Sequence, residues 1–132
     1  MEQPLILIAE DDVDNRVGYA EFLTYLGYSV AQATNGHDAI EWTRQLRPDV
    51  LLLDLALPLV DGWEVARVVK SDAQLSGTLI IALSACVFPS DVLRATDAGC
   101  DLFLDKPCYP QRVADEIRRM LEARRVAPVR GG

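Results

Sequence analysis

The chain has 132 residues and a mass of 14.6 kDa, and half of its residues are hydrophobic, so it has room for one domain with one sizeable core. Its 20 acidic and 13 basic residues give a net charge of −7, which argues against a general binder of nucleic acid or of anionic membranes. No apolar run approaches the roughly 18 residues of a membrane span, and no signal-like segment is present, so we expect a cytoplasmic protein.

Short apolar runs alternate with helical patterns along the chain, which predicts repeated strand–helix units. The predicted strands cover residues 5–9, 28–33, 50–53, 79–83 and 102–104, and the predicted helices cover about residues 12–26, 37–46, 63–70, 89–98 and 110–124. Unbroken apolar runs are typical of strands that are buried on both faces of a parallel sheet. We therefore expect an α/β fold, a doubly wound (βα)5 domain whose five-stranded parallel sheet carries helices on both faces.

The domain is expected to span residues 4–124, and residues 125–132 are expected to be a C-terminal tail or the stub of a linker. In the second helix, Leu46 is expected to face the core. The cysteines form neither a C-x-x-C pair nor an even disulfide set, so free thiols are expected. Cys86 and Cys100 are expected to be small buried side chains.

Polar side chains follow four of the five strands at the point where each strand ends. Glu10 and Asp11 come after the first strand, Asp54 ends the third, Ser84 ends the fourth and Lys106 follows the fifth. Because parallel strands end at the same edge of a sheet, we expect these side chains to meet there, where open α/β sheets bind their ligands.

Three neighbouring carboxylates repel one another, so the pattern predicts a bound cation. Ligand sets made only of oxygen are typical of Mg²⁺, which binds one or two carboxylates, several waters and the oxygens of a phosphate. The single histidine, His37, is expected in a turn elsewhere, so zinc is not expected. Lys106 and Ser84 are expected to contact oxygens of a phosphoryl group carried by Asp54, since phosphoryl transfer depends on positioning and charge stabilisation.

Four motifs in order resemble those of bacterial two-component response-regulator receiver domains, a chemotaxis-regulator-like family with a flavodoxin-like fold. They lie at residues 6–12, at 49–62 with its Asp54, Pro58, Asp61 and Gly62, at 82–85 and at 106–107. The resemblance covers about residues 4–124. It implies that Asp54 is the phosphoacceptor and takes a phosphoryl group from the phosphohistidine of a sensor histidine kinase or a phosphotransfer protein.

The resemblance also implies a metal site. Asp11, Asp54 and the backbone carbonyl of Ala56 would bind Mg²⁺ directly, and Glu10 would contribute through a water molecule. No other cofactor is implied.

A switch is implied by the same resemblance. Ser84 would move toward the new phosphoryl group, and Phe103 would turn into the vacated space. Phe103 lacks a hydroxyl, so an inward position is expected even without phosphate. The output would be a changed surface formed by the fourth helix, the fifth strand and the fifth helix, about residues 89–124. We expect that surface to bind an unknown downstream protein, with no direct contact to nucleic acid or membrane, in a monomer or a phosphorylation-dependent dimer.

One residue departs from the family pattern, and two others lie at positions where the family tunes the lifetime of the phosphoryl group. Leu59 stands where the family often has glycine, so a different backbone shape and an exposed apolar side chain are expected. Ala56 and Cys86 occupy the two positions that tune phosphoryl lifetime in the family. Neither side chain orients an attacking water as a carboxylate or an amide does, so slow hydrolysis is predicted.

Two other functions stay open beside the signalling module that catalyses its own phosphorylation and dephosphorylation. One is a pseudo-receiver, an interaction scaffold that is never phosphorylated. The other is an aspartate-nucleophile phosphohydrolase of the haloacid-dehalogenase type, which by resemblance has an acid where this chain has Ala56. No Walker loop or dinucleotide fingerprint opens a helix, so a nucleotide enzyme is not supported.

Overall fold

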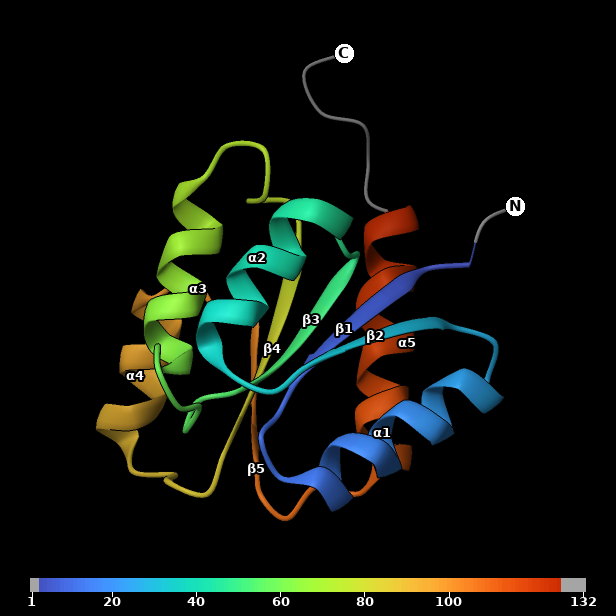
Figure 1. Ribbon diagram of the computed structural model, residues 1–132, viewed down its shortest axis with the longest axis horizontal. Helices are drawn as coiled ribbons and strands as arrows, with labels where there is room; N and C mark the ends of the chain where they lie inside the picture. The colour runs from blue at the N-terminus through green and yellow to red at the C-terminus, as the bar shows by residue number, and fades with distance from the viewer. Residues whose placement is uncertain (1–2, 127–132) are drawn as a thin grey trace.

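The computed structural model describes residues 3–126, in which five strands and five helices alternate (Figure 1). The strands are β1 (Leu5–Ala9), β2 (Ser29–Ala33), β3 (Val50–Asp54), β4 (Leu79–Ser84) and β5 (Leu102–Asp105). The helices are α1 (Val13–Tyr25), α2 (Gly36–Leu46), α3 (Gly62–Ser71), α4 (Pro89–Asp97) and α5 (Pro110–Val126). The last helix thus runs two residues past the expected end of the domain. The rest of the expected tail, residues 127–132, lies outside the described residues.

All five strands are parallel, and their order in the sheet is β2-β1-β3-β4-β5. The second strand, β2, pairs on one side of β1, and the chain then crosses over to place β3, β4 and β5 on the other side. Because the direction of the crossovers reverses, the helices lie on both faces of the sheet. Figure 1 shows α1 and α5 on one face and α2, α3 and α4 on the other. The predicted doubly wound α/β fold is confirmed.

Each central strand is buried on both faces, which explains its unbroken apolar run. In β1, Leu7 and Ala9 pack into the core beneath α2, α3 and α4, while Ile6 and Ile8 pack into the core beneath α1 and α5. We call these the first core and the second core. The two cores fix the strands from both sides, so the residues at the strand ends have a rigid base.

The helices α1, α2 and α3 begin at polar caps beside the sheet's C-terminal edge. The side chains of Asp12, Asn35 and Asp61 each accept a hydrogen bond, at 2.8–2.9 Å, from the backbone N–H three residues further on. At the opposite edge, Gly27 and Gly99 end α1 and α4 with a φ of 102°, a conformation that favours glycine. The polar caps thus satisfy backbone N–H groups at the starts of α1, α2 and α3, beside the strand ends.

Two expectations about single residues are wrong. Leu46 is 38% exposed because it is the last residue of α2, where the chain turns away at the left-handed Arg47, and Thr43 is buried instead. Cys86 is exposed because it lies in the loop after β4. His37 lies in the first turn of α2, near the predicted start of this helix, and its exposed side chain lies outside the carboxylate cluster as expected. Within residues 3–126, every helix is too short or too polar to cross a bilayer.

Candidate functional site

The ends of β1, β3, β4 and β5 lie side by side at one edge of the sheet. The register pairs Ala9 with Leu53, and it pairs the last residue of β4 with the last residue of β5. Across this edge the Lys106 Nζ lies 2.8 Å from Glu10 Oε1 and 3.1 Å from Asp54 Oδ2. The predicted meeting of these side chains is therefore present in the structure.

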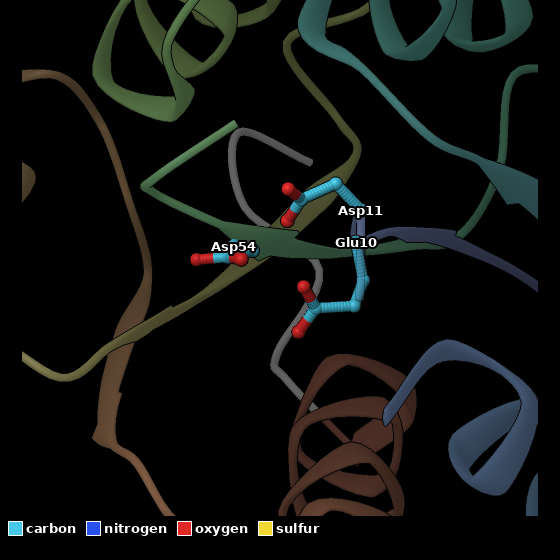
Figure 2. Close-up of side chains that lie close together, drawn as sticks. All are labelled: Glu10, Asp11 and Asp54. Carbon is cyan, nitrogen blue, oxygen red and sulfur yellow. The ribbon is translucent and has the colours of Figure 1, made fainter. Parts of the chain in front are cut away.

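Three carboxylates form a cluster at this edge. Figure 2 shows the Glu10 and Asp11 side chains leaving the end of β1 on different sides of the chain and both reaching toward Asp54. One oxygen from each carboxylate lies within 4.8 Å of the other two. Glu10 and Asp54 are only 1% and 3% exposed, whereas Asp11 is exposed to solvent. The cluster is thus a buried acidic pair with one carboxylate at its open side.

The donor set of this cluster fits a hard divalent cation. It contains only oxygen ligands, and among residues 3–126 Lys106 supplies the one ammonium that contacts it, so negative charge is left over. Mg²⁺ prefers such a small set of carboxylates because it keeps several of its waters. The residues present therefore suit Mg²⁺ rather than a metal that needs imidazole or thiolate ligands.

The cluster changes the acidity of its members. Burial raises the pKa of Glu10 to about 7, and contact with Asp54 adds to this, while the hydrogen bond from Lys106 opposes it. Burial alone would lower the pKa of Lys106, but its hydrogen bonds to Glu10 and Asp54 outweigh that effect and raise its pKa. Lys106 is therefore a fixed positive charge, whereas Glu10 readily accepts a proton when no cation is bound.

The backbone around Asp54 is held tightly. Asp54 Oδ1 accepts a hydrogen bond from the Ala56 amide at 3.0 Å, and the Leu55 amide donates to the Leu83 carbonyl at 3.0 Å. A Cβ at Gly62 would lie 2.7 Å from the Asp54 carbonyl oxygen, so only glycine lets α3 begin this close to the strand end. One oxygen of Asp54 is thus oriented by its own loop and the other by Lys106.

Ser84 is buried at the end of β4, on the neighbouring strand. Its Oγ accepts a hydrogen bond from the Cys86 amide at 3.0 Å, and its carbonyl accepts one from the Lys106 amide at 2.9 Å. Among residues 3–126, the Ser84 hydroxyl makes no hydrogen bond with Asp54 in this conformation. Phe103, on β5, is half-buried and packs against the first core. Its expected inward position in a switch stays a prediction.

Leu59 lies in the loop after β3 and is 81% exposed, as expected for an apolar residue at this position. Its φ is 71°, and the Val60 amide donates to the Pro58 carbonyl at 2.9 Å across it, which makes a γ-turn. The leucine therefore occupies a left-handed conformation that glycine favours. The expected difference in loop shape stays a prediction.

Two residues beside the site were missed in the sequence. Arg16, in α1, donates from Nη1 to the carbonyl of Glu10 at 3.1 Å and to that of Asp11 at 3.5 Å. Gly36 begins α2, and its amide donates to the Pro58 carbonyl of the loop after β3 at 3.1 Å. The only signal for Arg16 is its place one helical turn after the Asp12 cap, which brings its side chain back toward the strand end. No local signal identifies the Gly36 contact.

The fold and this acidic edge define a class of protein, a flavodoxin-like α/β domain with carboxylates gathered around one buried aspartate. A family model described as "Response regulator receiver domain" matches residues 6–118. The chain belongs to this family, as the resemblance of its motifs predicted. Receiver domains of two-component response regulators are signalling modules that interact with histidine kinases or phosphotransfer proteins and with downstream partners.

Relatives and solved structures agree with this assignment. The polar-differentiation response regulator DivK of Brucella anthropi is 31% identical over 116 residues, which cover 88% of this chain and 94% of the relative. The structure of the chemotaxis response regulator CheY4 of Vibrio cholerae has a TM-score of 0.84 at 25% identity, and the match covers 89% of this chain and 98% of that one. The signal receiver domain of a signal transduction histidine kinase from Syntrophus aciditrophicus has a TM-score of 0.85 at 29% identity, with coverage of 98% and 96%. The flavodoxin-like fold is thus shared with proteins that match over nearly their whole length.

Proposed function

We propose that this receiver domain accepts a phosphoryl group on Asp54 from the phosphohistidine of a sensor histidine kinase or a phosphotransfer protein, in a reaction that depends on Mg²⁺. The observation that carries the proposal is the contact of one ammonium, Lys106 Nζ, with both buried carboxylates, Glu10 and Asp54. In the transfer an Asp54 carboxylate oxygen attacks phosphorus. The phosphorus–nitrogen bond breaks, and its electron pair stays with the imidazole, which then takes up a proton.

The residues around Asp54 would divide the work of positioning and charge stabilisation. Lys106 contacts Asp54 Oδ2, and its ammonium is placed to contact an oxygen of a phosphoryl group attached to Asp54. Asp11, Asp54 and the Ala56 carbonyl would hold Mg²⁺ directly, with Glu10 contributing through water. When bound, Mg²⁺ neutralises the carboxylates and the phosphoryl oxygens, which otherwise repel each other. The Ala56 amide keeps Asp54 Oδ1 oriented toward the loop.

The donor would approach beside Lys106. A cavity of about 460 Å³ lies between α1 and the segment after β5, and its lining includes Tyr19, Lys106 and Tyr109. The Tyr19 hydroxyl donates to the Cys108 carbonyl at 2.7 Å, which ties this segment to α1. A helix that carries the phosphohistidine would find apolar contacts here and reach Asp54 past the lysine.

The phosphoryl group would change the surface formed by α4, β5 and α5. Ser84 would turn its hydroxyl toward the phosphoryl oxygens, and Phe103 would fill the space behind it. This surface presents exposed apolar side chains, including Phe88, Leu93 and Tyr109, which suit a downstream protein partner or a second copy of the chain. A cytoplasmic location, expected from the sequence, stays a prediction.

Intact-mass measurement after incubation with acetyl phosphate tests the proposal. We expect addition of one phosphoryl group that requires Mg²⁺ and is lost in Asp54→Ala. Asp105→Asn is the matched control, because Asp105 also ends a strand at this edge but is exposed and outside the carboxylate cluster. No mass increase would favour the interaction scaffold, and release of more than one phosphate per protein from small phosphoesters would favour the phosphohydrolase.

A further inference from the structure

Arg16 joins the acidic cluster to the edge strand of the sheet. Its Nη1 donates to the carbonyl oxygens of Glu10 and Asp11, at 3.1 and 3.5 Å, and its Nε donates to Gln32 Oε1 at 3.1 Å. Gln32 lies in β2, so the guanidinium is oriented from a second element before it reaches the end of β1. Because the fork of a guanidinium is planar and rigid, fixing its Nε also fixes the direction of Nη1.

The carbonyls that Arg16 contacts belong to the two acids that leave β1. Glu10 and Asp11 are adjacent, and their side chains leave the chain on different sides, yet both reach Asp54 (Figure 2). This arrangement depends on the orientation of the peptide planes at these two residues. The Glu10 amide is held by the Ala33 carbonyl at 3.0 Å, and the carbonyls on the other side are held by Arg16.

We infer that Arg16, oriented by Gln32, is a positioning residue for the metal-binding acids, and that it fixes the backbone of Glu10 and Asp11 so that their carboxylates converge on Asp54. The inference rests on the proposed Mg²⁺ site. It assigns to β2, a strand that supplies no ligand, a part in the geometry of that site. Loss of a hydrogen bond that orients a metal ligand commonly lowers metal affinity by about 10- to 100-fold.

The charge of Arg16 and its positioning role predict opposite results, which makes the inference testable. A guanidinium near an acidic cluster disfavours a second cation there, so removing the charge alone would strengthen Mg²⁺ binding. Removing the hydrogen bonds to Glu10 and Asp11 lets the two peptide planes turn. Ordering them again then reduces the net free energy of Mg²⁺ binding, so Mg²⁺ binds more weakly. The sign of the change in affinity therefore separates the two roles.

The experiment is a Mg²⁺ titration of the unphosphorylated protein, followed by the rise in Tm, which yields the Mg²⁺ dissociation constant. We expect Arg16→Met to weaken Mg²⁺ binding by about tenfold. Arg16→Lys keeps the charge but loses the planar guanidinium, so this variant should also bind Mg²⁺ more weakly. Gln32→Ala changes no charge and should weaken binding in the same direction by a smaller factor. The control is Arg44→Met, which removes the same charge from an exposed residue whose side chain pairs with Glu41 in α2, and it should leave Mg²⁺ affinity unchanged.

Unchanged or tighter Mg²⁺ binding in both Arg16 variants would overturn the positioning role. If Arg16→Met does not fold, Gln32→Ala decides, because its side chain is exposed and carries no charge; Mg²⁺ affinity equal to that of the wild type would overturn the inference. A wild-type protein that shows no Mg²⁺-dependent rise in Tm would instead refute the proposed metal site itself. The two failures are thus distinguishable in one set of measurements.

Discussion

Gly36 is the position where one added methyl group should disturb the loop beside Asp54. The amide of Gly36 donates to the Pro58 carbonyl at 3.1 Å, and the same carbonyl accepts from the Val60 amide at 2.9 Å. A Cβ at Gly36 would lie 1.7 Å from the Val60 carbonyl oxygen and 2.6 Å from its carbon. Ordinary contact begins near 3.4 Å, so Gly36→Ala requires the Val60 carbonyl oxygen to move by about 1.7 Å.

The cost of this movement follows from the contacts that it breaks. Two backbone hydrogen bonds to the Pro58 carbonyl contribute about 1 kcal/mol each. Val60 also packs against the first core, and its partial withdrawal costs about 1 kcal/mol more. We therefore expect Gly36→Ala to lower the free energy of unfolding by about 3 kcal/mol, which corresponds to a fall in Tm of roughly 10 °C for a domain of this size.

Thermal unfolding followed by circular dichroism measures the effect, with Gly18→Ala as the matched control. Gly18 lies inside α1, and a Cβ there would meet nothing within 4 Å. The same substitution should therefore stabilise the protein at Gly18, by about 0.5–1 kcal/mol, because alanine favours helix more than glycine does. A Tm of Gly36→Ala within about 2 °C of the wild type would refute the reasoning, since no single intact loop could hold both the methyl group and the two hydrogen bonds. Phosphorylation of Asp54 by acetyl phosphate should also be slower in Gly36→Ala, because the displaced loop carries the Ala56 carbonyl.

Three further predictions concern the site. The phosphorylated protein should lose its phosphoryl group slowly, because Ala56 and Cys86 offer no carboxylate or amide to orient water; intact mass at intervals after removal of the donor measures the decay, and loss within seconds contradicts the prediction. In the metal-free protein the pKa of Glu10 is raised from 4.5 to about 7, so the folded state holds this proton more tightly than the unfolded state does. The stability that results is complete below pH 4.5 and is lost as the pH rises through 7, a loss of up to about 3 kcal/mol. Urea unfolding at pH 5 and pH 8, with a chelator present, measures this loss of unfolding free energy. Between these two pH values Glu10→Gln should lose less stability than the wild type. Equal losses in the two proteins would show that Glu10 is not responsible. Leu59→Gly should not lower Tm. Relief of the left-handed conformation is worth about 1–2 kcal/mol and offsets the greater entropy of glycine in the unfolded state, and removal of the exposed leucine side chain loses little packing. A fall in Tm of more than about 3 °C would contradict this prediction.

The strand ends could be predicted from the sequence because their position depends on local patterns. Each central strand is a short apolar run that ends at a polar residue, and parallel strands leave those residues at one edge. Asp54 and Lys106 are 52 residues apart, yet their side chains touch in the structure. The resemblance to receiver domains added the roles of these residues, which composition and spacing do not supply.

The supporting contacts could not be predicted because they join elements that are distant in the sequence. Gly36 contacts the loop after β3 only because α2 and α3 lie side by side on one face of the sheet. Arg16 reaches Gln32 only because β2 pairs with β1 at the edge of the sheet. Apolar character alone also misplaced Leu46 and Cys86, since a residue at the end of an element can be apolar and still lie beyond the core.

A single hydroxyl links the proposed chemistry to the proposed output surface. Ser84 Oγ is the acceptor for the Cys86 amide, at 3.0 Å, in the loop that leads to α4. If Ser84 turns toward a phosphoryl group on Asp54, its Oγ leaves that amide, and the loop must find another acceptor or move. The Lys106 backbone amide donates a hydrogen bond to the Ser84 carbonyl at the same strand end, so β4 and β5 receive the change together. The exposed Phe88 lies two residues further along this loop, which is why a rearrangement of this one partly buried hydrogen bond would alter the surface that a partner protein meets.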